Sequence, residues 1–279
     1  MAQLKYLYVT DQRYHMNSLL KFQFDIMINA VKHDFDCVFV IDGEIEGVGK
    51  SVLGQQAGYY FSYVLGQPFT IDNIVFDPQE FRKKVLELPQ NSVIIWDEAY
   101  IGSSKYRVMS GINQTIQSLL QQIRQKNMVI IIIIPYIFDL SMYIAVPRSW
   151  FLLHVDLRPV YGEDEEDTIS PLDFTKEVFE RGYVTFYSRK QKKLLYFLGK
   201  KMYNYNAVRN SFIARFPKHY TVDEQEYKKK KADIRTDTRI TEKELAMELL
   251  GRGMGVPELQ KWVKLSKVSL YSYKKKLIS

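Results

Sequence analysis

Four short apolar segments restrict the fold more than any other feature of this sequence. They lie within residues 37–41, 91–98, 129–134 and 151–155, and their apolar positions are mostly valine, isoleucine, leucine and phenylalanine. Runs this short that are apolar at consecutive positions are typical of strands buried on both faces. Helical periodicity is found between or before them, at residues 17–32, 50–65 and 111–126. This alternation predicts an α/β fold whose mostly parallel sheet is covered by helices on both faces.

The segment between the first strand and the next helix has the composition of a phosphate-binding loop. It contains Gly43, Gly47 and Gly49 and ends in Lys50 and Ser51. Glycines between a strand and a helix let backbone amides approach a phosphate, and the helix N-terminus attracts its charge. In such a loop Lys50 would contact the β- and γ-phosphates of ATP, and Ser51 would bind Mg²⁺. A strand–turn–helix junction with a chance Gly-Lys-Ser sequence is the alternative.

The spacing of this loop differs from the usual one. A phosphate-binding loop normally has glycine at the position of Glu44, whereas here the glycine is Gly43, so the loop is one residue longer. Glu44 and Glu46 would repel a phosphate and are therefore expected to point outward. The residues expected to surround the nucleotide are Gly43, Glu46, Gly47, Val48, Gly49, Lys50, Ser51 and Val52.

The second strand ends in two acidic residues, Asp97 and Glu98. In a nucleotide site Asp97 would hold Mg²⁺ through water, opposite Ser51, and Glu98 would act as the general base that polarises the attacking water. Adjacent acids at a strand end also occur as caps of the next segment. Together with the glycine-rich loop, they predict ATP hydrolysis with ATP and Mg²⁺ as cofactors.

Two arginines flank the third strand, Arg124 before it and Arg148 after it. Each is a candidate arginine finger that would reach the γ-phosphate of a neighbouring subunit. The alternative for both is a surface or ion-paired arginine. A sensor residue is expected where the third strand ends, and Tyr136 and Ser141 are the candidates there.

These segments, taken in order, resemble the HerA/FtsK-type P-loop ATPases, in particular Zot-like and terminase-like members from phages, archaeal viruses and mobile elements. The resemblance covers roughly residues 17–220 and rests on the loop, the Ile-Ile-Trp-Asp-Glu-Ala-Tyr sequence at 94–100 and the strand at 129–134. It implies an additional-strand (RecA-like) domain and a usually hexameric ring that moves double-stranded DNA. By its position relative to the third strand, Arg124 matches the arginine finger of the family better than Arg148 does. The Thr-Gln sensor of the family is missing at the end of this strand.

Positive charge is concentrated near the end of the chain. Residues 200–279 hold 19 Lys and Arg against 9 Asp and Glu, whereas the whole chain holds 39 and 32. This asymmetry favours binding to a polyanion, with DNA as the first candidate and a solubilising end as the alternative. We expect an ATPase domain at 1–199, a basic linker at 200–238 and a small all-α domain at 239–279.

The last segment predicts three short helices that resemble the helix-turn-helix of resolvases. Thr241 and Glu244 form a capping box for the first helix, and Lys267 begins the last one. Val268 and Leu270 are expected to pack inward. A helical bundle that binds protein is the alternative. The residues expected to contact DNA are Lys267, Ser269, Tyr271, Ser272 and Lys274.

Several classes of protein are excluded by composition. A single cysteine, Cys37, excludes an internal disulfide and a multi-cysteine zinc site. The longest apolar run, residues 128–138, is too short to span a bilayer, so we expect no membrane insertion and a cytoplasmic location, in a host cell if the protein is viral. Alternating residues at 182–188 and 194–198 predict a β-hairpin.

The sequence therefore predicts an ATP-hydrolysing translocase or packaging motor for double-stranded DNA, with copies of itself and a viral or mobile-element protein as further partners. The alternative is an ATP-switched DNA-binding assembly factor of transposition, partition or viral morphogenesis, without directional translocation.

Overall fold

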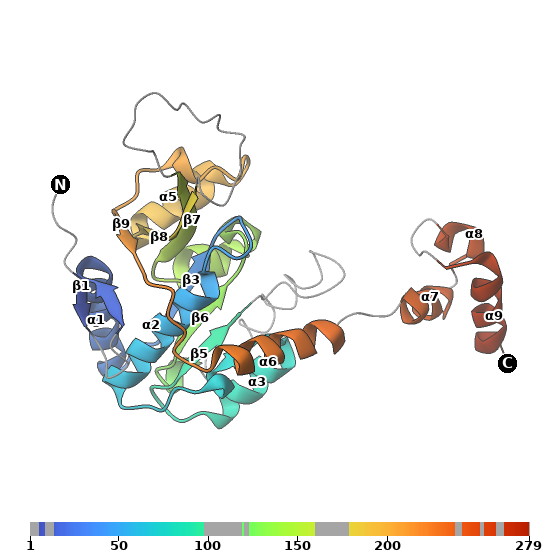
Figure 1. The fold of residues 1–279 in the computed structure, drawn as a ribbon, viewed down its shortest axis with the longest axis horizontal. Helices are drawn as coiled ribbons and strands as arrows, with labels where there is room; N and C mark the ends of the chain where they lie inside the picture. Colours follow the sequence, from blue (N-terminus) through green and yellow to red (C-terminus); the bar gives the residue numbers. More distant parts are fainter. Residues whose placement is uncertain are drawn as a thin grey trace.

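A seven-stranded sheet forms the centre of the protein (Figure 1). The computed structural model describes residues 6–8, 14–97, 119, 123–159, 179–237, 242–251, 254–260 and 265–278. The strands, in their order across the sheet, are β4 (Ile74–Val75), β5 (Val93–Trp96), β6 (Val129–Ile133), β3 (Cys37–Asp42), β7 (Leu152–Pro159), β8 (Phe179–Tyr187) and β9 (Phe212–Arg215). The first five are parallel to their neighbours, and β8 and β9 add antiparallel. The predicted α/β class with a mostly parallel sheet is confirmed.

Helices cover both faces of this sheet because its central strands are apolar at every position. Phe39 and Ile41 of β3 pack in one core with α1 (Ser18–Lys32) and α2 (Lys50–Leu65), whereas Val38 and Val40 pack in the other. The second core includes α3 (Pro78–Glu87) and α5 (Arg189–Gly199). Successive side chains of a strand point to opposite faces, so both faces of β3 are buried.

Smaller elements complete the described chain. Two short strands, β1 (Tyr6–Tyr8) and β2 (His15–Asn17), pair antiparallel. Short helical turns occur at η1 (Ile71–Asn73), η2 (Ile137–Asp139), η3 (Ile144–Arg148) and η4 (Tyr205–Ala207). Among the helices that the structure describes, none has the length and apolar character needed to cross a bilayer.

The predicted hairpin at 182–198 is wrong in its second half. Residues 182–187 belong to β8, which pairs with β7 and β9, but Arg189–Gly199 is the helix α5. Ser188 and Gln191 form a capping box, and the buried positions recur at helical spacing. Residues 189–193, which would form the turn of the predicted hairpin, are instead the beginning of helix α5.

The segment at 200–238 also differs from the expected linker. It contains β9, which forms an edge of the sheet, and α6 (Glu224–Asp237), whose Tyr227 is buried. The part of the chain built around the sheet thus extends into α6, as far as Lys230. Phe212 and Ala214 of β9 pair with β8 and pack in the core. The basic composition of the segment gave no sign of this strand.

Three helices, α7 (Glu242–Gly251), α8 (Val256–Leu259) and α9 (Lys267–Ile278), form a separate cluster (Figure 1). Their common core consists of Ala246, Leu250, Val256, Leu259 and Leu270. Leu270 packs inward as expected, but Val268 is 80% exposed, so that expectation is wrong. Successive helical residues differ by about 100° in direction, so Val268 and Leu270 cannot share one narrow face.

Lys192 of α5 is fully buried and donates hydrogen bonds to the carbonyl oxygens of Ala145 and, at 3.0 Å, of Val146. Burial, assisted by the nearby charge of Arg189, lowers the pKa of Lys192 from 10.5 to about 7. Between pH 7 and 10.5 the unfolded chain therefore binds more protons at this position than the folded chain. Stability contributed by this residue accordingly rises with pH in that window.

We expect Lys192→Met to remove the pH dependence of stability that the buried Lys192 contributes. At pH 7 the variant should unfold at a higher urea concentration than the wild type, because it has no buried ammonium group to desolvate. The difference should shrink as the pH is raised to 9.5. Urea titrations at pH 7.0, 8.0, 9.0 and 9.5 measure it, and a difference that stays constant across the series would contradict the expected titration.

Candidate functional site

The glycine-rich loop and Asp97 lie at the same edge of the sheet. The loop follows β3 and Asp97 follows β5, with β6 between the two strands. Ile132 of β6 is the register partner of both Val40 and Trp96, so Asp97 is level with Ile41. Because neighbouring strands lie about 4.8 Å apart, two strand spacings of about 10 Å in total separate β3 from Asp97.

The loop has a backbone conformation suited to an anion. Gly47 and Gly49 have φ values of +76° and +110°, and Gly49 begins α2 without a side-chain cap. The first hydrogen bond of α2 runs from the N–H of Leu53 to the oxygen of Gly49, at 3.0 Å. The amides of residues 50–52 therefore precede the helical hydrogen bonds, and the helix N-terminus adds positive potential.

The first glycine of the loop, Gly43, has a packing explanation. A Cβ atom at Gly43 would clash with the carbonyl oxygen of Val155 in β7. Gly43 is thus required by the neighbouring strand, whereas Gly47 and Gly49 supply the left-handed backbone. Glu44 and Glu46 are exposed, as expected.

Lys50 lies across the loop. Its Nζ atom donates to the carbonyl oxygen of Gly43 at 2.5 Å and to that of Ile45 at 3.0 Å. The side chains of Val48 and Val52 are buried in the core, so they can contribute only backbone groups to a ligand. The buried side chains of Val48 and Val52 therefore anchor the loop, while Lys50 bonds with its backbone carbonyl groups.

Close packing of α2 on the sheet fixes the position of Ser51. A Cβ atom at Gly54 would lie 2.6 Å from the Cδ1 atom of Ile133, the last residue of β6. Ser51 precedes Gly54 by about one helical turn, which places it beyond the carboxyl ends of β3 and β6. Ser51 and Asp97, the two residues predicted to bind Mg²⁺, are thus brought to one edge of the sheet.

Asp97 has a partner that the sequence does not suggest. The hydroxyl group of Tyr227 in α6 donates to Oδ2 of Asp97 at 2.6 Å, and both side chains are buried. The pair is separated by 130 residues of sequence. This contact connects the edge of the sheet directly to the helix that precedes the C-terminal cluster.

The segment that leads to α6 also contacts the loop and α2. The ring of Phe216 lies within 3.1 Å of the position that a Cβ atom of Gly49 would take. The side-chain amide of Gln56 donates to the carbonyl oxygens of Pro217 and His219 at 2.7 and 2.9 Å. Residues 216–227 therefore run from the glycine-rich loop, along α2, to Asp97.

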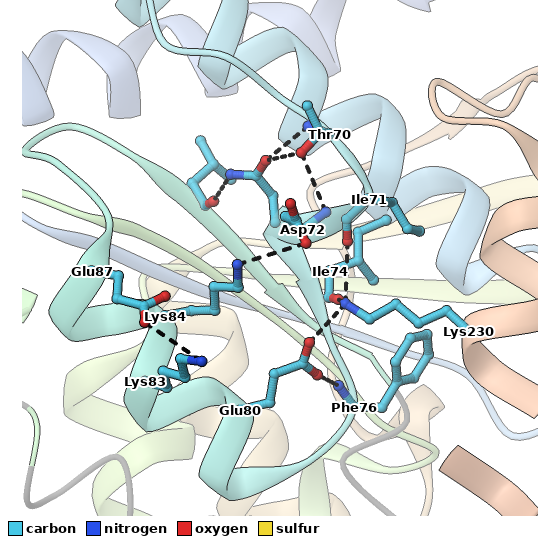
Figure 2. Close-up of polar contacts among 12 residues, drawn as sticks. Thr70, Ile71, Asp72, Ile74, Phe76, Glu80, Lys83, Lys84, Glu87 and Lys230 are labelled. Carbon is cyan, nitrogen blue, oxygen red and sulfur yellow. Dashed lines mark hydrogen bonds and ion pairs between the residues drawn. The ribbon is translucent and has the colours of Figure 1, made fainter. Parts of the chain in front are cut away.

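Lys230 anchors α6 one turn beyond Tyr227 (Figure 2). Its Nζ atom donates to the oxygen of Ile74 at 2.6 Å and forms an ion pair with Glu80 of α3 at 2.8 Å. Both groups are only about a quarter exposed. This three-way contact holds α6 against β4 and α3, which keeps the Tyr227 hydroxyl group at Asp97.

Asp42, the last residue of β3, is fully buried beside the loop and accepts several hydrogen bonds. Its Oδ2 atom accepts from the N–H of Ile137 at 2.9 Å and from the hydroxyl group of Tyr205 at 2.5 Å, and Oδ1 lies 2.8 Å from Nδ1 of His154. Burial lowers the pKa of His154, but the charge and hydrogen bond of Asp42 outweigh it, and the net pKa is raised. Asp42 thus joins β3 to β7 and two turns.

The two arginines lie at the opposite edge of the sheet, because both precede strands parallel to β3. Arg148 is 13% exposed and pairs with Asp36, and burial lowers its pKa to about 10. It therefore matches the ion-paired alternative. Arg124 is exposed and, together with Asp34, lines an open pocket. Neither reaches the loop of its own chain.

The remaining predicted residues are partly described. Glu98 and Thr241 lie outside the residues that the structure describes. Tyr136 packs edge-on against Tyr203, and Oγ of Ser141 accepts from the N–H of Ile144 at 3.4 Å. Four of the five predicted DNA-contacting residues are exposed on α9, namely Lys267, Tyr271, Ser272 and Lys274. The fifth, Ser269, is half-buried and bonds with Ser266.

Sequence reasoning missed Tyr227, Phe216 and the network around Asp42. No local signal marks them, because each acts through a contact with a distant segment. Comparisons with protein-family models and with curated proteins give no match to this chain.

Proposed function

We propose that this protein is an ATP-hydrolysing DNA translocase or packaging motor of the additional-strand (RecA-like) type, as its resemblance to HerA/FtsK ATPases implies. The observation that carries the proposal is the position of the glycine-rich loop and Asp97 at one edge of the sheet, with β6 between their strands. Mononucleotide sites in open α/β sheets lie at the carboxyl ends of the strands.

The residues at this edge fit ATP and Mg²⁺. The uncapped start of α2 and the left-handed Gly47 and Gly49 form a backbone surface for phosphate oxygens. A serine hydroxyl and a carboxylate are ligands that suit Mg²⁺. When bound, the metal ion would neutralise charge on the phosphates. Lys50 would exchange its carbonyl partners for phosphate oxygens, and Glu98 would take a proton from the attacking water.

The C-terminal cluster supports the DNA-binding part of the proposal. On α9 the buried Leu270 faces the cluster core while Lys267 and Lys274 are exposed. Such an arrangement suits a recognition helix in a helix-turn-helix domain, with lysines available to neutralise phosphates. We also propose a hexameric ring located in the cytoplasm. The exposed Arg124 is then the better finger for a neighbouring subunit.

The direct test is ATP hydrolysis with and without double-stranded DNA. We expect DNA to stimulate turnover, and Glu98→Gln to reduce the stimulated rate at least 100-fold while ATP still binds, because only proton removal is impaired. Phosphate release and fluorescent-nucleotide binding measure the two effects. Turnover in Glu98→Gln equal to that of the wild type would refute the proposed mechanism.

A second function is favoured by the hydrogen bond between Tyr227 and Asp97. Because it joins the proposed metal site to α6, nucleotide could switch the position of the C-terminal cluster without driving movement along DNA. The protein would then be an ATP-switched assembly factor of transposition, partition or viral morphogenesis. A triplex-displacement assay separates the two functions, since only a translocase removes the third strand in a reaction that requires ATP hydrolysis.

We expect Tyr227→Phe to lower the Mg²⁺ concentration needed for half-maximal ATP binding by about 10- to 100-fold. The hydroxyl group of Tyr227 donates to a carboxylate oxygen of Asp97 and so competes with Mg²⁺ for it. A hydrogen bond to a charged group contributes about 1.5–3 kcal/mol, which the metal would no longer have to overcome in the variant. Tyr220→Phe is the matched control, because its ring lies 6.0 Å from that of Tyr227. A higher Mg²⁺ requirement in Tyr227→Phe would show instead that the phenol positions Asp97 for the metal.

A further inference from the structure

The outward face of α5 is unusually apolar for an exposed helix. Leu194, Phe197 and Leu198 are 51%, 54% and 62% exposed, and Met202, just beyond the helix, is 77% exposed. Leu194, Phe197 and Leu198 recur at helical spacing and share one side of the helix. These three residues, together with Met202 in the turn that follows, are here called the α5 face. In Figure 1 the helix lies at the periphery of the sheet, beside β7 and β8.

Contacts on the buried side of α5 fix the orientation of the helix, so that the α5 face points away from the sheet domain. Leu195 is fully buried, and the hydroxyl group of Tyr196 donates to the carbonyl oxygen of Leu140 at 2.8 Å. A Cβ atom at Gly199 would lie 2.5 Å from the carbonyl oxygen of Asn204, so the end of the helix is closely packed. The helix therefore cannot rotate to bury its apolar face without breaking these contacts.

Positive charge surrounds the α5 face. The lysines that flank the apolar residues are exposed, and they are Lys190, Lys193, Lys200 and Lys201. Between Glu180 and Asp223 the sequence contains ten Lys and Arg and no Asp or Glu. Within the described part of the chain, Lys190, Lys193 and Lys201 form no ion pair with a carboxylate. The face thus combines unburied apolar area with uncompensated cations.

We propose that the α5 face binds the surface of an anionic lipid bilayer. An apolar strip bordered by lysines is the arrangement of an interfacial helix, in which apolar side chains enter the headgroup boundary and lysines contact anionic headgroups. The long lysine stems can lie along the boundary while their charges remain in water. Nucleic acid would use the lysines but would leave Phe197, Leu198 and Met202 exposed, so charge and apolar area together favour the bilayer.

The experiment is co-sedimentation of the full chain with sonicated vesicles, without nucleotide. We expect binding to vesicles of phosphatidylglycerol and phosphatidylcholine in equal amounts, and at least tenfold weaker binding to phosphatidylcholine alone. Phe197→Glu should weaken binding to the anionic vesicles at least tenfold. Replacing Lys190, Lys193 and Lys201 together with glutamine should have a comparable effect.

Phe22→Glu is the matched control, because Phe22 on α1 is 59% exposed and the substitution adds the same charge to a similarly exposed phenylalanine. It should bind vesicles as the wild type does, and thermal unfolding should show that all variants fold. Equal vesicle binding by Phe197→Glu and wild type would overturn the proposal. A second outcome would also overturn the proposal. In that outcome neither the wild type nor any variant binds vesicles, the triple variant of Lys190, Lys193 and Lys201 loses duplex-DNA binding, and Phe197→Glu keeps it. No step requires ATP, so the outcome is independent of the proposed ATPase function.

Discussion

Replacing Lys50 with alanine is expected to reduce DNA-stimulated ATP turnover at least 100-fold. The ammonium group of Lys50 lies across the glycine-rich loop, where it donates to the carbonyl oxygens of Gly43 and Ile45. Phosphoryl transfer is accelerated mainly by positioning and by charge stabilisation, and removing one such group commonly costs a factor of 10² to 10³. A phosphate-release assay at saturating DNA measures the loss.

The control for this substitution is Lys83→Ala. Lys83 belongs to α3 and its side chain is 72% exposed, in a surface pair with Glu87. It should hydrolyse ATP at the wild-type rate, and both variants should melt within a few degrees of the wild type. If Lys50→Ala retained more than a tenth of the wild-type turnover while binding DNA normally, the loop would not be a catalytic phosphate site.

Replacing Asp42 with alanine is expected to lower the free energy of unfolding by about 3–5 kcal/mol, the range found when one partner of a buried charged pair is removed. Three donors, from Ile137, Tyr205 and His154, would lose their acceptor at a position where the Asp42 side chain is fully buried. Urea unfolding followed by tryptophan fluorescence measures the change.

This loss should depend on pH. The folded-state pKa of His154 is raised, so the stabilisation from the charged His154–Asp42 pair is fully present below the unfolded pKa of about 6.5 and is lost as the pH rises through the folded value. The difference between wild type and Asp42→Ala should therefore be larger at pH 6 than at pH 8.5. Asp42→Asn keeps one acceptor oxygen, so its loss should be smaller, but its pH dependence should be similar because the charge that raises the pKa of His154 is removed in both variants. A difference for Asp42→Ala that is below 1 kcal/mol at both pH values would contradict this account.

The contacts of residues 216–230 offer a physical route between the two proposed activities. Phe216 packs on the loop, Tyr227 bonds with Asp97, and Lys230 holds α6 on α3. A change at the loop or at Asp97 would therefore be felt by α6, which leads to the C-terminal cluster. The Mg²⁺ dependence of Tyr227→Phe examines the first step of this route.

Local patterns predicted the central sheet well. The strands at Cys37, Val93, Val129 and Leu152 were expected because consecutive apolar residues of this length suit few other structures. The helices from Ser18 and Lys50 were expected from their periodicity. The segment at 182–198 was misread because exposed leucine and phenylalanine residues on α5 imitate an alternating strand.

The sequence by itself determined the class of fold, the strands that carry the loop and Asp97, and the helix that begins at Lys50, because these depend on short-range periodicity and on glycine at fixed spacing. Only the tertiary structure decided that Gly43 serves packing against Val155, that Arg148 is held by Asp36, and that β9 and α6 belong to the sheet domain rather than to a linker. It also decided that Tyr227 meets Asp97 across 130 residues of sequence. The physical reason is that each of these features is a contact between distant segments, and the hydrogen bonds, ion pairs and close approaches involved leave no periodic trace in either segment alone.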